Sequence, residues 1–421
     1  MDLATAKSSV AAWTNSWLSW APSVWVGKLS YSLYLWHWPV YVLARWTTGL
    51  DTWTTRVPAL GATVLLSWAS YTWVENPFRR GPLLHKVRPY AVIAGGLFCL
   101  FVAWRTARLV DHQQGRLSLS VIQKKPDDWY PSQGPLLPGK TSAAGCMMPE
   151  ERLEALGHAG VTVLDHGNCN TTETVKTVYV TGNSHALSYV TMLSTLVRQE
   201  PFNVRVVVHG ECTLLTLIAP MATDSPECRR FYENVLVDTE SRLRPGDFVF
   251  LPALRIERFI GEAVVYSEAS VREKMFGKKA VEEREAAIEE ADGVLERLVR
   301  RGIVVIFEAP KPVYRAAAFR CSDWFNRRNP ACAGGLTMSR DYLLRYREPV
   351  LEAMNRLSGR HHHVYVWDPF NTLCPTVTCE AVRNGSPLFF DGDHLSAHAN
   401  RVLYPEFMEF LRSHVAVESL E

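Results

Sequence analysis

The sequence has almost no net charge, because 45 lysines and arginines oppose 43 aspartates and glutamates and leave a formal charge of +2. A protein that binds nucleic acid through its phosphates needs a basic excess, so this composition excludes nucleic acid as the main partner. Charged residues are also missing from three apolar runs, 29–44, 57–74 and 89–104. The sequence therefore divides into an apolar N-terminal part and a part that reads as soluble α/β protein from about Asp111 onward.

The three apolar runs have the composition of membrane helices. A spanning helix needs roughly 17 to 25 apolar residues. The runs 29–44 and 89–104 are slightly short by that measure, and their terminal Trp, Lys and Arg side chains are needed to reach the headgroups. The alternative, buried core helices of a soluble protein, fits the Trp-rich flanks less well. A cleavable signal peptide is disfavoured because no small-residue cleavage site follows the first run.

Positive charge predicts the orientation of these runs. The loop 75–88 carries four basic side chains, whereas the loop 47–56 is far less basic. Basic loops stay on the cytoplasmic side, so we expect the chain from about Arg108 onward to lie outside the cytoplasm. His37 lies inside the first run, where an ionisable residue is a functional candidate. A neutral histidine hydrogen-bonded between helices is the alternative, and both remain open.

The cysteines agree with this orientation. Cys99 lies in the third apolar run and is expected to be a free packing residue. The other eight all lie in the part placed outside, and an even number there indicates disulfides in an oxidising compartment. Sequence proximity suggests the pairs Cys146–Cys169, Cys212–Cys228, Cys321–Cys332 and Cys374–Cys379.

A zinc site is the competing interpretation of these cysteines. Zinc sites are typically built from two closely spaced ligand pairs, and only Cys374 and Cys379 are close enough to form one. The histidine run 361–363 does not supply the second pair, because adjacent residues of a strand point to alternate faces. We therefore expect no metal.

The outer part alternates between strand and helix patterns. Five short β-branched runs begin at 177, 203, 247, 302 and 362, and the clearest helical pattern covers 278–302. Such alternation predicts an α/β fold with a parallel sheet covered on both faces. Sites of such sheets lie at the carboxyl ends of the strands, which selects the turns after these runs.

Those turns carry residues suited to nucleophilic catalysis. Ser184 follows the first strand in "TGNSH", and Gly210 follows the second. A serine hydroxyl needs a base, and the base needs an orienting acid. His394 and Asp391, at D-x-x-H spacing after the fifth strand, supply both. The backbone N–H groups of Ser184 and Gly210 are candidate donors to a developing oxyanion.

Each of these signals has an alternative. Gly-x-Ser-His is a helix cap or turn more often than an active site. Asp393 is a second candidate for orienting His394, and His185 and His398 are rival bases. The order of the motifs, with serine after the first strand and D-x-x-H after the last, favours the catalytic interpretation.

The motifs also carry a family resemblance. "GNSH" followed far downstream by "DGDHLS" resembles the SGNH/GDSL hydrolase superfamily. The membrane part, "GKLSYSLYLWHWPV" and then "YTWVENPFRR", resembles the end of an acyltransferase-3 integral membrane domain. Their fusion is similar to bacterial membrane O-acyltransferases of the O-antigen acetylase type. The resemblance runs from about Trp17 and includes the segments "GECTLLTLIAP…ECRRFYENV" and "DPFNTLCPTVTCEAV…LFFDGDHLS".

The resemblance implies an SGNH-hydrolase-like, flavodoxin-like parallel sheet that follows about three transmembrane helices. It divides the chain into a membrane part at 1–107, a periplasmic linker or extension at 108–171 and an SGNH domain at 172–421. It also implies that Ser184 is the nucleophile, His394 the base and Asp391 its partner, with Gly210 in the oxyanion hole.

Two departures from the family pattern stand beside this assignment. Asn183 replaces the aspartate that usually precedes the serine, which we expect to affect turn geometry more than chemistry. The asparagine block that many SGNH enzymes use as an oxyanion donor is absent, and "LPALRIERF" stands in its place. Arg255 is the candidate substitute, and a surface ion pair is the alternative interpretation of that residue.

By the same resemblance, the expected function is O-acyl transfer, O-acetyl in the first instance, to a sugar hydroxyl of a cell-envelope polysaccharide such as lipopolysaccharide O-antigen. A periplasmic carbohydrate esterase or deacetylase is the first alternative, since the same triad serves both. A non-catalytic, membrane-anchored glycan-binding module is the second. No bound cofactor is expected, and the acyl donor would ultimately be acetyl-CoA.

The expected location is the bacterial inner membrane, as a multi-pass protein in contact with lipid and with its C-terminal domain in the periplasm. Acyltransferase-3 domains normally begin with several more membrane helices than the sequence contains. We therefore expect the missing helices to come from another chain or from a longer form, and acetyl-CoA to be out of reach of this chain alone.

Overall fold

The computed structural model describes residues 19–80, 87–131, 150–166, 175–261 and 264–415. The chain divides into two compact units. The first comprises Met1–Ser118 and Trp324–Pro330, and the second comprises Leu119–Asp323 and Ala331–Glu421.

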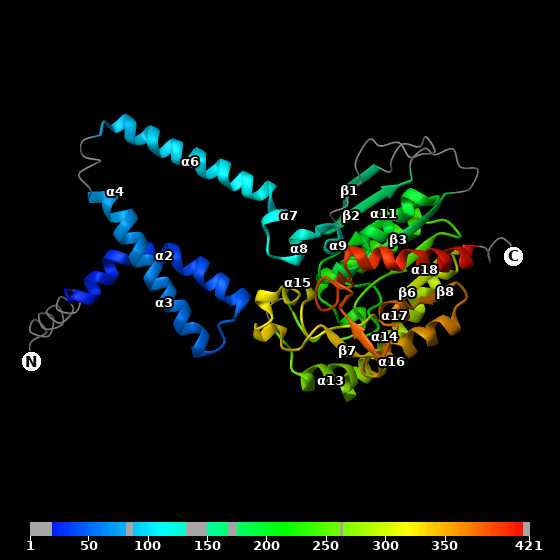
Figure 1. The fold of residues 1–421 in the computed structure, drawn as a ribbon. Helices are drawn as coiled ribbons and strands as arrows, with labels where there is room; N and C mark the ends of the chain where they lie inside the picture. The colour runs from blue at the N-terminus through cyan, green and yellow to red at the C-terminus, as the bar shows by residue number, and fades with distance from the viewer. Residues whose placement is uncertain (1–18, 81–86, 132–149, 167–174, 262–263, 416–421) are drawn as a thin grey trace, which may run out of the picture. The chain divides into compact units, whose positions relative to one another are not determined.

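The first unit is helical (Figure 1). Its elements are α2 (Ala21–Thr47), α3 (Trp53–Ser70), the π-helix η1 (Tyr71–Glu75), α4 (Asn76–Arg80), α6 (Pro89–His112), α7 (Gln114–Leu117) and the 3₁₀ turn η3 (Trp324–Asn326). Helices α2 and α3 pack together, and the buried residues of this pair are mostly small: Ser32, Ala59, Thr63 and Ser67. Small side chains let two helices approach closely, which is the packing mode of helices in membranes.

The predicted membrane runs 29–44 and 89–104 fall within α2 and α6, and the run 57–74 extends over α3 and into η1. Within the described residues, α6 is the one helix whose length and apolar composition suit a membrane span. Helices α2 and α3 do not meet that measure. The prediction of about three spans is therefore supported for one helix only.

His37 does not bridge two helices. Its Nδ1 lies 2.6 Å from the carbonyl oxygen of Tyr34, one turn earlier in α2, and the residue is exposed. The hydrogen bond satisfies the ring within its own helix, so the structure gives no interhelical role to His37.

The second unit is built on a seven-stranded sheet with strand order β1-β2-β4-β3-β5-β6-β8. The strands are β1 (Glu150–Leu156), β2 (Ala159–Asp165), β3 (Lys176–Gly182), β4 (Phe202–Val208), β5 (Phe248–Leu251), β6 (Val304–Glu308) and β8 (Val364–Trp367). Strands β3, β4, β5, β6 and β8 are parallel. Their order is the 2-1-3-4-5 arrangement of flavodoxin-like sheets, so the five predicted strands and the predicted α/β fold are confirmed.

The hairpin β1–β2 was not expected. It pairs antiparallel with β4 and extends the sheet within the segment 108–171, which the sequence suggests is a linker. The sequence "EERLEAL" of β1 is rich in Glu, Leu and Ala, which favour helix in isolation. Pairing with β2 overrides that preference, because strand formation depends more on its neighbours than on intrinsic tendency.

The second unit also contains helices that pack around the sheet. They are α8 (Val121–Lys124), α9 (Pro126–Trp129), α10 (Ser184–Leu187), α11 (Val190–Gln199), α12 (Pro226–Arg242), α13 (Glu268–Phe276), α14 (Lys278–Val299), α15 (Ala318–Cys321), α16 (Arg340–Arg360), α17 (Phe370–Leu373) and α18 (Ala397–Val415). Helices α11 and α18 pack against each other. Helices α12, α14 and α16 are joined by the ion pairs Arg297–Glu240 and Arg356–Glu285, both at 2.6 Å.

Shorter elements complete the second unit. They are the 3₁₀ turns η2 (Met221–Thr223) and η4 (Pro330–Cys332) and two small antiparallel pairs, β7 (Thr337–Ser339) with β9 (Thr378–Glu380) and β10 (Val382–Arg383) with β11 (Ser386–Pro387).

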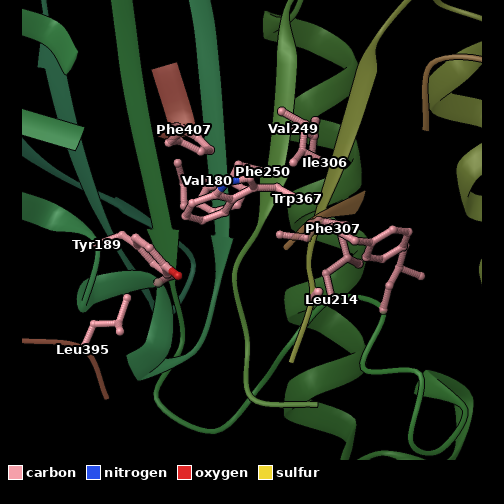
Figure 2. Close-up of a cluster of buried hydrophobic side chains, with 14 of the residues drawn as sticks. Val180, Tyr189, Leu214, Val249, Phe250, Ile306, Phe307, Trp367, Leu395 and Phe407 are labelled. Atoms are coloured by element: carbon pink, nitrogen blue, oxygen red, sulfur yellow. The ribbon is translucent and has the colours of Figure 1, made fainter. Parts of the chain in front are cut away.

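Aromatic side chains fill the core between the sheet and α18 (Figure 2). Phe250 of β5 and Trp367 of β8 both contact Phe407 of α18, with ring centres 5.0 and 4.8 Å apart. Tyr189, which follows the short helix α10, meets Phe250 edge-on at 5.5 Å. Each buried aromatic contributes about 1.5–3 kcal/mol of transfer free energy. The cluster fixes the start of α11 and the body of α18 against the same strands.

Three of the four predicted disulfides are present: Cys212–Cys228, Cys321–Cys332 and Cys374–Cys379. Cys146 and Cys169 lie outside the described residues. Cys99 is free and exposed on α6.

Candidate active site

The serine turn begins where β3 ends. Gly182 is the last residue of the strand, and a Cβ there would lie 2.6 Å from the carbonyl oxygen of Pro252. Only glycine allows the chain after β5 to pass so closely. Asn183 then caps α10, since its side-chain oxygen accepts a hydrogen bond from the backbone N–H of His185 at 3.0 Å. The cap starts the helix at Ser184.

The histidine loop is shaped by Asp391. Its Oδ1 accepts hydrogen bonds from the backbone N–H groups of Asp393 and His394, at 2.9 and 2.8 Å. Gly392 is required here as well, because a Cβ would lie 2.6 Å from Cγ2 of Ile260. The D-x-x-H spacing thus folds the carboxylate back onto its own loop and turns the imidazole outward.

Ser184 and His394 meet across 210 residues of sequence. The Ser184 hydroxyl lies 2.7 Å from Nε2 of His394, and Nδ1 of His394 lies 2.8 Å from Oδ2 of Asp391. Because a carboxylate can only accept, Nδ1 carries the proton of the neutral ring, and Nε2 of that neutral ring accepts from the serine hydroxyl. The geometry is that of a nucleophile, a base and an orienting acid.

The charges around His394 favour its protonated form. Burial opposes the imidazolium, but hydrogen bonds and charge from Asp391 and Asp393 outweigh burial and raise the pKa of His394 to about 9. The pKa of Asp391 moves the other way: burial would raise it, yet the contact with His394 and two backbone N–H groups hold it well below its usual range. The imidazolium that forms when His394 takes the proton of Ser184 is therefore stabilised by its ion pair with Asp391.

Two further groups surround the imidazole. The ring of His185 stacks on that of His394, with centres 4.1 Å apart and planes 14° from parallel. Oδ1 of Asp393 lies 3.0 Å from His394 Nδ1. His185, Asp393 and His394 each place a possible metal ligand atom within 4.8 Å of the others. Both ring nitrogens of His394 are also engaged, Nε2 by Ser184 and Nδ1 by the two carboxylates.

The rival bases do not contact the serine hydroxyl in this arrangement. His185 is wholly buried, and burial keeps its pKa well below the ordinary value. Burial also lowers the pKa of His398, whose charged neighbours include Asp128 and Arg401. The hydrogen bond of Ser184 goes to His394.

Gly210 follows β4 by two residues, and its role in the oxyanion hole stays a prediction. Gly182 pairs with Val208, and the N–H of His209 contacts the carbonyl oxygen of Gly182 at 3.3 Å, so Gly210 follows beside the serine turn. Arg255 does not lie open to a substrate. It is wholly buried and donates to the carbonyl oxygens of Leu215 and Leu251, at 3.1 and 2.9 Å. The Arg255 side chain therefore binds backbone within the protein, and neither expected role, oxyanion donor or surface ion pair, matches this position.

Sequence reasoning missed a residue that joins the two catalytic loops. Asn400 of α18 is wholly buried, and its Nδ2 donates to the carbonyl oxygens of Ser188 and Ser396, at 2.7 and 2.8 Å. Its Oδ1 accepts from the N–H of Met192 at 3.0 Å. The only signal in the sequence is a polar residue on the apolar side of the last helix, six positions after the predicted base.

A buried ion pair supports the neighbouring strand ends. Glu308, the last residue of β6, pairs with Lys311 at 2.6 Å, and both side chains are almost completely buried. Glu308 also accepts from the N–H of Ala253 after β5, at 3.1 Å, and from the hydroxyl of Tyr189. These contacts tie the turns after β3, β5 and β6 together at the edge of the sheet that carries Ser184.

Comparison with known proteins identifies the family of the domain. Residues 146–409 match the family described as SGNH domain (fused to AT3 domains). The chain belongs to this family. The SGNH domain matched in this way includes the whole seven-stranded sheet and the two loops that carry Ser184 and His394.

Among curated proteins, the chain is 28% identical over 127 residues to "Putative peptidoglycan O-acetyltransferase YrhL" of Bacillus subtilis (strain 168). The alignment covers 28% of this chain and about one fifth, 20%, of that relative.

Solved structures resemble this SGNH protein at low identity. One is a Salmonella ser. Paratyphi A lipopolysaccharide acetyltransferase periplasmic domain, at 14% identity and a TM-score of 0.37, covering 58% of this chain and 85% of that one. Another is described as "a putative SGNH hydrolase from Slackia heliotrinireducens", at 16% identity and a TM-score of 0.31, covering 56% of this chain and 98% of that one.

Proposed function

We propose that the protein transfers an O-acyl group, O-acetyl in the first instance, to a sugar hydroxyl of a cell-envelope polysaccharide such as lipopolysaccharide O-antigen. The observation that carries the proposal is the contact of the Ser184 hydroxyl with His394 Nε2 at 2.7 Å, with Asp391 behind the ring. Membership of an SGNH family described as fused to AT3 domains, and a relative named as a peptidoglycan O-acetyltransferase, support acyl transfer on glycans.

The reaction follows from the geometry in two halves. His394 Nε2 takes the hydroxyl proton of Ser184 as its oxygen attacks the acyl carbonyl carbon of the donor. The donor's leaving group departs with that proton, and an acyl ester remains on Ser184. A sugar hydroxyl then gives its proton to His394 and attacks the ester, and the proton returns to Ser184 as the acylated sugar leaves.

The oxyanion formed in each half needs donors in fixed positions. We assign this role to the backbone N–H groups of Ser184 and Gly210, with Asn183 setting the angle of the serine turn through its cap on His185. Arg255 has no part in the proposal, because its side chain is buried among backbone carbonyls.

An esterase that removes acyl groups is the second candidate function. The side chains of His394 and Asp391 are 19% and 27% exposed, so water can reach an acyl ester on Ser184. The same residues would then deacylate the enzyme with water in place of a sugar hydroxyl. The acceptor, and not the triad, distinguishes the two reactions.

We further propose that the protein resides in a bacterial inner membrane, with α6 as one span, α2 and α3 as two more, and the SGNH domain in the periplasm. Acetyl-CoA is the proposed ultimate acyl donor. Because it is charged and cytoplasmic, its acyl group would reach Ser184 through acyltransferase-3 helices in contact with lipid.

The test uses the full chain in detergent, with p-nitrophenyl acetate as an artificial donor and an envelope polysaccharide as acceptor. Wild type should release p-nitrophenol and acylate the glycan, and mass spectrometry of the glycan separates transfer from release of free acetate. Ser184→Ala should lose both activities by about 10⁴-fold or more, since the catalytic residues act as a unit. Ser413→Ala, at an exposed position near the end of α18, is the control for the serine-to-alanine change. Equal activity of Ser184→Ala and wild type would reject the proposal.

A further inference from the structure

A second carboxylate lies against the catalytic imidazole. Oδ1 of Asp393 is 3.0 Å from His394 Nδ1, almost as close as Asp391 Oδ2 at 2.8 Å. The two differ in environment, because the side chain of Asp393 is 4% exposed and that of Asp391 is 27% exposed. Aspartate is almost never buried so completely without a partner for its charge. The burial of Asp393 therefore needs an explanation.

The other oxygen of Asp393 identifies its partner. Oδ2 lies 3.2 Å from Nε of Arg258, on the loop after β5, and 3.8 Å from Nε2 of His185. Burial keeps His185 neutral, so the guanidinium supplies the positive charge beside Asp393. The Arg258 side chain is 38% exposed and reaches the carboxylate from the surface.

The groups that face His394 are few. Asp391 and Asp393 come from its own loop, and Ser184 and His185 come from α10. Arg258 faces Asp393 from the loop after β5, while Lys311 and Arg255 act on His185 at longer range. The pKa of Asp393 is raised, because burial and the charge of Asp391 outweigh the opposing contacts with His394 and Arg258.

Resting on the proposed function, we propose that Asp393 is a positioning residue: it shares the Nδ1 proton of His394 with Asp391, keeps the ring turned toward Ser184, and is itself held by Arg258. The triad thus has two carboxylates on one nitrogen. Asp391 shapes the loop through its backbone contacts, and Asp393 holds the same proton from the buried side.

This arrangement changes what loss of Asp391 does. In a triad with one carboxylate, replacement by asparagine turns an amide N–H toward Nδ1, imposes the wrong tautomer and costs about 10⁴-fold in rate. In Asp391→Asn, Oδ1 of Asp393 still accepts from Nδ1, so the correct tautomer survives. The expected loss is only about 10- to 100-fold, and the double variant with Asp393→Asn should lose the remaining activity, to about 10⁴-fold.

Asp393→Asn alone should act mainly on the pH dependence. It leaves Asp391 in place but removes one negative charge from the surroundings of His394. The imidazole should then lose its proton at lower pH, and Ser184 should become reactive at lower pH. Arg258→Gln should weaken the hold on Asp393, and Arg258→Lys should restore part of it because the cation is kept.

The experiment measures the rate at which a fluorophosphonate labels Ser184 in the full chain from pH 5 to 10. Labelling needs the Ser184–His394 pair but no glycan. If Ser184 is labelled but no glycan is acylated, the proposed transferase function is rejected and this inference is not. Asp341→Asn, on the exposed first turn of α16, controls for the aspartate-to-asparagine change. We expect the pH at which labelling reaches half its maximal rate to be at least one unit lower in Asp393→Asn than in wild type, which is a tenfold lower hydroxide concentration.

Two results would overturn the inference. One is an unchanged midpoint in Asp393→Asn, and the other is a double variant that labels as fast as Asp391→Asn. If wild type is not labelled, the melting temperature decides. The melting temperature of each variant is compared with that of His394→Gln at the same pH. Between pH 6.5 and 9 this difference should decline less in Asp393→Asn than in wild type. An equal decline in the two proteins would contradict the proposed contact.

Discussion

Asn400 Nδ2 donates a hydrogen bond to the carbonyl oxygen of Ser188 at 2.7 Å, across 212 residues of sequence. Ser188 lies four residues after the proposed nucleophile and Asn400 six residues after the proposed base. The Ser184 hydroxyl and His394 Nε2 lie 2.7 Å apart. The two segments that carry them are therefore also joined through the buried side-chain amide of Asn400.

Replacement of Asn400 should loosen the contact between Ser184 and His394. Asn400→Ala leaves the N–H of Met192 and the carbonyl of Ser188 without their side-chain partner, and each unsatisfied buried group costs about 1–3 kcal/mol. We expect a lower melting temperature and slower fluorophosphonate labelling at temperatures where the variant is fully folded.

Asn355→Ala on the exposed face of α16 is the control for that substitution. A variant Asn400→Ala that melts lower but labels at the wild-type rate would show that Asn400 serves the fold alone.

Stability should fall as the pH rises above neutrality. The folded-state pKa of His394 is about 9, above the ordinary 6.5, so protonation of His394 stabilises the fold fully below pH 6.5. This contribution, at most about 3 kcal/mol, is lost as the pH rises through about 9. His394→Gln should remove that part of the decline in melting temperature between pH 6.5 and 9. An identical decline in both proteins would contradict the assignment.

The loss of stability at acid pH should depend in part on Asp391. Its pKa is lowered in the folded protein, so its ionised form stabilises the fold above the ordinary pKa of about 3.9, and this contribution is lost as the pH falls below that value. Asp391→Asn should therefore flatten the acid side of the stability curve, as measured by thermal unfolding between pH 2 and 5. The Asp341→Asn variant should keep the wild-type slope.

The three disulfides should be oxidised in the native protein. Cys212–Cys228, with a sequence separation of 16, should contribute about 3 kcal/mol by the chain-entropy account, and the shorter loops less. Alkylation of the unreduced, denatured protein followed by peptide mass spectrometry should leave these six cysteines unmodified. Cys99 is free, so its modification serves as the internal positive control. Six alkylated thiols would be incompatible with an oxidising compartment.

The SGNH domain should lie outside the cytoplasm. The basic loop 75–88 is expected to stay inside, and α6, the helix that best suits a membrane span, follows it. A reporter that is active only in the cytoplasm should be silent when fused after Glu421, and a reporter that needs the periplasm should be active there. Replacing the four basic side chains of the loop with glutamine should weaken this orientation. Strong cytoplasmic activity of the wild-type fusion would reverse the topology.

The sequence by itself determined the order of the strands and catalytic motifs along the chain. The β-branched runs of β3 and β6 are buried on both faces, which gives them a continuous apolar pattern. The cap at Asn183 is likewise a local requirement, because Asn183 binds the N–H of His185 only two residues away, so "GNSH" can be recognised from the amino-acid order alone. The reason for glycine at Gly182, the close approach of Pro252, lies in the tertiary structure. The D-x-x-H loop can be recognised in the same way, because Asp391 binds backbone groups only two and three residues away.

Only the tertiary structure decided which groups surround the imidazole. Asp393, His185 and Arg258 come from two loops and a helix, and their distances depend on how β3, β5 and the C-terminal loop pack. Arg255 shows the same limit: its sequence position is after β5, but its direction is set by the carbonyl groups it satisfies. The strand β1 could not be predicted from the sequence for a related reason, since its residues favour helix and only pairing with β2 makes it a strand. Local patterns report what a segment can form, whereas side-chain direction and strand pairing depend on contacts that are distant in sequence.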